Sequence, residues 1–190
     1  AFGGVLAGQA AAALGAGWSA AFIAGPLGFF QASSARWADR RLALAGLGAT
    51  RTALARIASA LVLAAVASGA ALAALLLRTD VAHPWHAAAA VLGFAVIYLA
   101  VGTVVGSVVR GPLEGSLAVA GVFLLDVFVG PGMSPDPPAW SISQQAGDVL
   151  IAAASGEGSP TGDLLKLSAV VAVATTTAFV VFVLSARART

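Results

Sequence analysis

Cysteine and charge are the scarcest features of this chain. It contains no cysteine in 190 residues, which excludes disulfides, thiolate metal sites and cysteine nucleophiles. Only 9% of its residues are charged, whereas a soluble domain carries about 25%. Hydrophobic residues make up 59% and the mean hydropathy is +0.95. Because apolar side chains can face outward in lipid, we expect an all-α, polytopic membrane helix bundle that forms one transmembrane domain over residues 1–190.

The sequence also lacks the short motifs of common catalytic sites. It has no GxxxxGK[ST] phosphate-binding loop, no HExxH pair and no nucleophile elbow. We therefore expect no catalytic residue, metal or cofactor on this chain. His83 and His86 flank Pro84 and Trp85 with only Asp80 nearby, so we interpret them as an interfacial loop rather than a metal site. The basic residues lie between apolar stretches rather than on one polar face, so nucleic acid is not an expected partner.

Five apolar stretches have about the 20 residues that a helix needs to cross a bilayer. They are, approximately, Phe2–Gln31, Ile57–Leu77, Trp85–Val109, Leu113–Val129 and Leu167–Leu184. Pro26 is expected to kink or end the first of them. The chain starts at an apolar Ala1 without a charged leader region, which is not typical of a signal peptide. We expect that a preceding segment is missing.

Lysine and arginine in short loops predict the orientation of the spans. Eight of the ten basic residues fall in connections on one side, and only Arg78 and Lys166 fall on the other. The eight are Arg36, Arg40, Arg41, Arg51, Arg56, Arg110, Arg187 and Arg189. Because the basic side is cytoplasmic, we expect a multi-pass protein of the cell inner membrane with a cytoplasmic C-terminus.

Two connections are long enough to hold structure of their own. Segment 32–56 places Arg and Asp ahead of spaced leucines, which predicts a short amphipathic helix on the cytoplasmic face. Segment 130–163 contains five of the eight prolines and is expected to be an extracytoplasmic loop. Within it, Trp140–Ala154 is too short and polar to span, so we expect one or two short helices in the outer leaflet.

Two patterns inside the predicted spans could mark helix contacts. Gly4 and Gly8, and Gly102 and Gly106, match the GxxxG spacing that lets membrane helices approach closely. With 22 glycines in the chain, matches by chance are expected.

Asp126 is the one carboxylate in the interior of a predicted span, since Glu114 lies at the very start of the fourth span. A charge at that depth costs about 2.5–3.5 kcal/mol on insertion scales, so such a residue usually has a partner or faces water. One interpretation is a residue that lines a transport route or an outer gate, together with Gly130 and Pro131. The other, which we favour, is a structural cap to backbone amides near the break at Gly130 and Pro131.

Three segments, taken in order, carry a resemblance to a known family. They are Asp39–Gly46 in the cytoplasmic connection, Gly102–Gly115 around the next inner turn, and Leu125–Met133 at the outer end of the fourth span. Together with short outer helices before the last span, this order resembles the permease subunit of type-2 ABC exporters. That family has six spans per permease, so the resemblance implies that the first span is absent from this sequence.

The resemblance implies a dimer of permease chains, identical or different, that forms the substrate pathway in the bilayer. A separate ABC ATPase subunit would bind ATP and magnesium. The residues expected to contact that ATPase are Trp37, Asp39, Arg40, Arg41, Leu42, Leu44 and Leu47. The pathway or gate would include Asp126, Gly130 and Pro131, and the inner turn Arg110 and Glu114. Walls of Ala, Val, Leu and Gly favour an apolar or amphipathic cargo.

Other functions compete with this one. Arg41–Arg51 also resembles the cytoplasmic segment of FtsX-like ABC permeases, which have four spans and a large extracytoplasmic domain not seen here. A stand-alone secondary transporter or channel predicts several charged residues within spans, and only Asp126 is found. A membrane scaffold that transports nothing would need no pathway at all.

Overall fold

The fold, given by a computed structural model, is described for residues 6–44, 49–109, 111–131, 134, 138, 140–156 and 160–187. These residues form six helices and no strand. The helices are α1 (Leu6–Leu44), α2 (Ala49–Leu76), α3 (Pro84–Val108), α4 (Pro112–Val129), α5 (Gln144–Ser155) and α6 (Pro160–Arg187). All of them except α5 are long and apolar enough to cross a membrane. The expected all-α helix bundle with five spans is confirmed.

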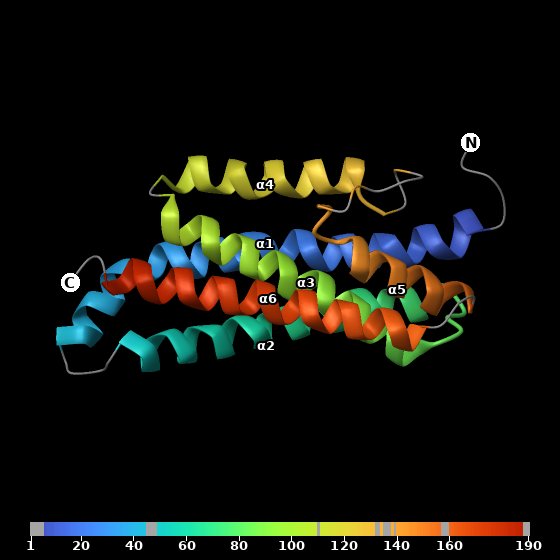
Figure 1. Cartoon of the computed structure of the whole chain (residues 1–190), viewed down its shortest axis with the longest axis horizontal. Coiled ribbons are helices and arrows are strands. Elements are labelled where there is room, and N and C mark those ends of the chain that lie inside the picture. Colours follow the sequence, from blue (N-terminus) through green and yellow to red (C-terminus); the bar gives the residue numbers. More distant parts are fainter. Residues whose placement is uncertain are drawn as a thin grey trace.

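The five long helices run up and down, side by side, so that their ends gather at two opposite ends of the molecule (Figure 1). One end holds the last residues of α1, α3 and α6 and the first residues of α2 and α4. We call it the basic end, because the arginines that predict the cytoplasmic side fall in these helix ends and connections. We call the opposite end the far end. The far end holds the connections from α2 to α3, from α4 to α5 and from α5 to α6. Which side of the membrane each end faces stays a prediction from the loop charges.

The first helix differs from the sequence expectation. α1 continues past Pro26 and past the predicted span to Leu44. Segment 32–56 therefore forms no separate interfacial helix in its described residues, because 32–44 extend α1 and 49–56 begin α2. A helix end leaves four backbone carbonyls unpaired, and Ala, Leu and Arg are good helix formers. Continuing the helix through this stretch avoids an extra pair of helix ends.

The centre of the bundle is α3. In its most apolar stretch 61% of the residues are buried, compared with 17% in the corresponding stretches of α4 and α6. It crosses α1 at very close range through glycines. A methyl group on Gly102 would collide with the backbone carbonyl of Gly25, and one on Gly106 with that of Phe29. On the other helix, a methyl group on Gly28 would collide with the carbonyl of Leu99. The Gly102–Gly106 pattern therefore mediates a real helix contact, whereas Gly8 faces open space.

The short helix α5 lies at the far end of the bundle (Figure 1). Its 12 residues span about 18 Å at 1.5 Å per residue, too short for a hydrocarbon core of about 30 Å. Ala146, Val149, Leu150 and Ala153 are buried in the core shared with α1 and α3. Gly156 ends the helix in the left-handed conformation, with φ of 73°. The prediction of a short helix within Trp140–Ala154 is confirmed.

Candidate functional site

The most concentrated polar structure inside the bundle surrounds Asp126, near the far end of α4. Its Oδ2 accepts a hydrogen bond from the Tyr98 hydroxyl of α3 at 2.7 Å. Its Oδ1 accepts one from the Ser141 hydroxyl at 2.9 Å and one from the Ile142 backbone N–H at 3.1 Å. Asp126 is only 2% exposed. We call Tyr98, Asp126, Ser141 and Ile142 the Asp126 centre.

The break after α4 is what brings these groups together. The helix ends at Val129, and Gly130 donates its N–H to the Asp126 carbonyl at 2.7 Å. Pro131 is buried, and its ring lies so close to Gly147 of α5 that a methyl group there would collide with it. The connection then returns to Asp126 through Ser141 and Ile142, so Gly130 and Pro131 help to position α5.

The charge of Asp126 is met by hydrogen-bond donors. Among the described residues, no basic side chain forms an ion pair with it. Three donors therefore satisfy this one carboxyl group. The bond from the Ile142 amide is the contact that the structural interpretation expects. Participation in a pathway or gate stays a prediction.

Sequence reasoning identified Asp126 but not its partners. Tyr98 is the only tyrosine in the chain and lies fully buried on α3. Its ring packs edge-on against Phe123 at a centroid distance of 5.6 Å and against Trp18 at 6.3 Å. A lone tyrosine within an apolar span was the available signal, because a buried hydroxyl needs a hydrogen-bond partner.

The residues expected to contact an ATPase lie near the basic end. Trp37, Asp39, Arg40, Arg41, Leu42 and Leu44 all belong to the last turns of α1. Leu47 lies outside the described residues. Helix α1 thus carries this set beyond its apolar stretch, which ends at Ser34.

The inner turn between α3 and α4 is only partly described. Arg110 lies outside the described residues, so its place in the inner turn stays a prediction. Glu114 is exposed in the first turn of α4. A carboxylate there complements the positive end of the helix dipole.

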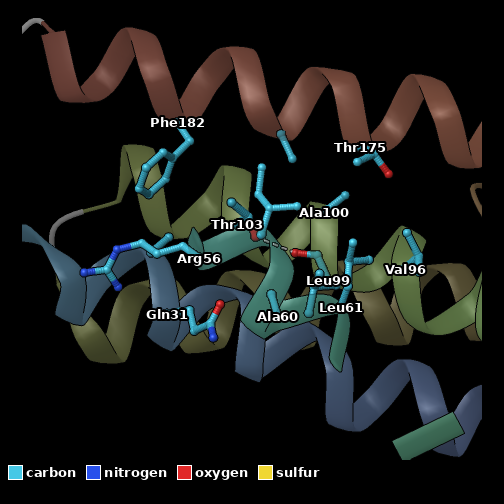
Figure 2. A pocket seen from close by; sticks show the side chains of 13 residues that line it. Gln31, Arg56, Ala60, Leu61, Val96, Leu99, Ala100, Thr103, Thr175 and Phe182 are labelled. Carbon is cyan, nitrogen blue, oxygen red and sulfur yellow. Dashed lines mark hydrogen bonds between the residues drawn. The ribbon is translucent and has the colours of Figure 1, made fainter. Parts of the chain in front are cut away.

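A small pocket lies between α1, α2, α3 and α6, toward the basic end (Figure 2). Its volume of about 30 Å³ has room for about two water molecules, so it is too small for a transported lipid or drug. Gln31, Arg56, Thr103 and Thr175 are its polar lining. The apolar lining is Ala32, Ile57, Ala60, Leu61, Val96, Leu99, Ala100, Ala178 and Phe182.

The histidine pair lies at the far end, where α3 begins. The rings of His83 and His86 contact each other with centroids 5.5 Å apart. The His83 backbone N–H bonds to the Ala153 carbonyl of α5 at 2.9 Å. Among the described residues, no group of three or more His, Asp or Glu side chains could hold a metal ion. Through its backbone, His83 therefore contributes to the contact between the α2–α3 connection and α5.

Compared with protein-family models, with curated proteins and with solved structures, the chain has no match.

Proposed function

We propose that this chain is the permease subunit of an ATP-driven exporter of the type-2 ABC class. Two permease chains would enclose the substrate pathway, and a separate ATPase subunit would bind and hydrolyse ATP. The observation that carries the proposal is the form of α1. Its apolar stretch ends at Ser34, yet the helix continues without a break through the arginine-rich segment to Leu44.

A continuous helix is a suitable element for transmitting a displacement. The end of α1 carries Trp37, Asp39, Arg40 and Arg41, which a partner ATPase would contact. The same helix crosses α3 through glycines at backbone contact distance. Because close-packed elements move as rigid bodies rather than deform, a push on the end of α1 would move α1 and α3 together.

The far end would respond to that movement through α4. Tyr98 lies on α3, and its hydroxyl is bonded to Asp126 of α4. Asp126 is bonded in turn to the connection that leads into α5. The path from the basic end to the far end therefore runs through α1, α3 and the Asp126 centre, which would act as the outer gate. The apolar walls favour an apolar or amphipathic cargo.

The first experiment is co-purification from native membranes in mild detergent, followed by an ATPase assay. We expect an ATPase subunit to purify with the chain. The double variant Arg40→Ala/Arg41→Ala should loosen that subunit or uncouple its ATP hydrolysis from transport. The matched control is Arg78→Ala/Lys166→Ala, which removes two positive charges near the far end and should leave both properties unchanged. If no nucleotide-binding subunit associates in any detergent or nanodisc, the proposal is wrong.

The second candidate function is a secondary transporter that works alone. The observation in its favour is Asp126, a buried carboxylate inside a span, since intramembrane acids often belong to ion or proton pathways. This function predicts transport by the purified chain in liposomes without ATP.

A further inference from the structure

The pocket between α1, α2, α3 and α6 differs in chemistry from one end to the other (Figure 2). Arg56 and Gln31 lie at one end, and the guanidinium group of Arg56 points away from the apolar lining. Val96 and Thr175 lie at the other end. Leu61, which also lines the pocket, is 36% exposed, so the pocket reaches the surface of the bundle. A molecule that matches this arrangement has a polar part and an apolar part.

The inner part of the pocket offers no unused hydroxyl proton to a polar ligand. The Thr103 hydroxyl donates to the Leu99 carbonyl at 2.8 Å, and the Thr175 hydroxyl donates to the Val171 carbonyl at 2.8 Å. The rest of the lining there is aliphatic, and cavities with apolar walls stay dry. The volume of about 30 Å³, comparable to about two water molecules, admits a short length of an acyl chain and not a whole lipid.

The polar end of the pocket lies at the level of a membrane surface. The apolar stretch of α1 ends at Ser34, three residues after Gln31, and that of α2 begins at Leu54, two residues before Arg56. At 1.5 Å per residue these offsets are about 3–5 Å. Arginine side chains near the ends of membrane helices extend to the headgroup layer. Arg56 is therefore at the depth of the lipid phosphates, and the apolar end of the pocket is at the depth of the acyl chains.

The charge of the lining selects an anionic ligand. Arg56 is the only charged residue among the thirteen that line the pocket, and the arginine side chain is not deprotonated in proteins. Its five N–H donors allow it to hold a phosphate together with another contact. Basic pockets between membrane helices on the cytoplasmic side bind anionic lipid head groups, and the loop charges predict that this end is cytoplasmic. We infer that the pocket binds one anionic phospholipid, with its phosphate at Arg56 and part of one acyl chain in the apolar end.

The bound lipid would stabilise the bundle at its basic end. Its phosphate would lie where α1 and α2 already meet, since the Gln31 side-chain amide donates a hydrogen bond to the Ser59 hydroxyl at 3.1 Å. Its acyl chain would contact α3 and α6, which line the rest of the pocket. Such a lipid is a structural ligand and not a cargo, so the inference does not depend on the proposed export function.

The test is thermal unfolding of the purified chain in detergent micelles, followed by tryptophan fluorescence. The probe is dioleoylphosphatidylglycerol, titrated as a fraction of the micelle. Dioleoylphosphatidylcholine, with the same acyl chains and no net charge, and inorganic phosphate are titrated in parallel. With the anionic lipid in roughly hundredfold excess over its Kd, we expect Tm to rise by about 5 °C and then to saturate. The other two should raise Tm by less than half as much.

Three results would overturn the inference. Equal rises with the two lipids would mean that the head group is not recognised. An equal rise with inorganic phosphate would mean that the site binds a free anion and needs no acyl chain. The absence of any rise with the anionic lipid would mean that the pocket binds neither.

A pair of arginine variants separates this site from general attraction of anionic lipids. Arg56→Gln should weaken the apparent affinity for the anionic lipid at least tenfold. Arg51→Gln is the matched control, because Arg51 is an exposed arginine on the same helix that does not line the pocket. It should leave the affinity within about twofold. Equal weakening in the two variants would contradict the inference.

A second pair of variants tests the apolar end. Ala178→Leu adds carbon atoms to the lining of the pocket and should weaken lipid binding although Arg56 is kept. Thr177→Leu, at the neighbouring exposed position of α6, should not. An unchanged affinity in a folded Ala178→Leu variant would place the acyl chain elsewhere and contradict the inference. If that variant does not fold, the arginine pair decides.

Discussion

Helix α3 meets its neighbours α1 and α4 in opposite ways. It packs closely against α1, because Gly102 and Gly106 leave room for the backbone of that helix. It contacts α4 through a side chain, because the Tyr98 ring packs against Phe123 and the Tyr98 hydroxyl donates a hydrogen bond to Asp126. Lipid supplies no hydrophobic force between helices, so close packing and polar bonds are the available means of association. The first contact depends on the close approach of two backbones, whereas the second depends on one ring contact and one hydrogen bond.

This difference suits a division of roles within the bundle. At the α1–α3 contact, the backbones lie so close that even a methyl group on Gly28, Gly102 or Gly106 would collide with a carbonyl group. The α3–α4 contact depends on a few hydrogen bonds, each worth about 0.6–2 kcal/mol in membranes. We therefore expect α1 and α3 to move as a unit and the end of α4 to be the part that rearranges.

The largest expected effect comes from adding bulk to the α1–α3 contact. Gly102→Val would force side-chain atoms into the Gly25 carbonyl and should destabilise the chain by about 3 kcal/mol or more. Gly69→Val is the control, because a Cβ at that position on α2 meets nothing within 4 Å. The measurement is the unfolding midpoint in mixed detergent–SDS micelles. Similar midpoints for the two variants would show that the glycine contact is not rigid.

A smaller effect is expected from removing the carboxylate of α4. Asp126→Ala leaves the Tyr98 and Ser141 hydroxyls and the Ile142 amide without their acceptor, which should cost about 2 kcal/mol. Asp126→Asn keeps an acceptor oxygen and should cost less. Hydrogen exchange of the amide of Ile142 gives a local readout, and it should speed up in the alanine variant. If its protection stayed the same, the bond from Ile142 would have no role in holding α5.

Removing one hydrogen bond sharpens the comparison further. Tyr98→Phe keeps the ring contact with Phe123 and loses only the hydrogen bond to Asp126. We therefore expect the free energy of unfolding to fall by about 0.6 kcal/mol. A double-mutant cycle with Asp126→Ala isolates the pair, and the second change should add little once the first is made. Full additivity of the two losses would mean that Tyr98 and Asp126 do not interact.

The smallest expected effect is a pH dependence of stability that arises from Asp148 on α5. Burial raises the pKa of Asp148, Asp163 adds to the increase and Lys166 opposes it. A folded-state pKa above the unfolded value of about 3.9 means that stability falls as pH rises from that value through the raised pKa. Asp148→Asn should therefore raise Tm slightly at pH 7 and leave it unchanged at pH 3. Asp80→Asn, in an exposed loop, is the control, and an equal rise there would contradict the assignment.

Hydropathy alone predicted most of the fold. The predicted spans from Ile57 onward agree with the apolar helices to within about five residues at each end, and the short helix expected within Trp140–Ala154 is found at Gln144–Ser155. Of the two alternatives for Pro26, a kink or a helix end, the helix end is wrong, because α1 continues past Pro26 to Leu44. A proline removes only one backbone bond, and in a membrane helix neighbouring groups can compensate for it.

The candidate site was predictable only in part. Asp126 stands out because an acid in an apolar stretch is costly, and the break at Gly130 and Pro131 stands out because both residues interrupt helices. Nothing in the local pattern linked Asp126 to Tyr98, 28 residues earlier, or to Ser141, 15 residues later. Those partners come from other elements, so sequence spacing carries no signal for them.

By itself, the sequence determined that the chain forms membrane-spanning helices, how many there are and where the charge lies. These properties follow from local composition, because each span must be apolar along its own length and must satisfy its own backbone hydrogen bonds. The tertiary structure decided which glycines lie at the contact between α1 and α3, and which donors surround Asp126. Those features depend on how helices far apart in the sequence pack, and packing is a property of the pair rather than of either segment.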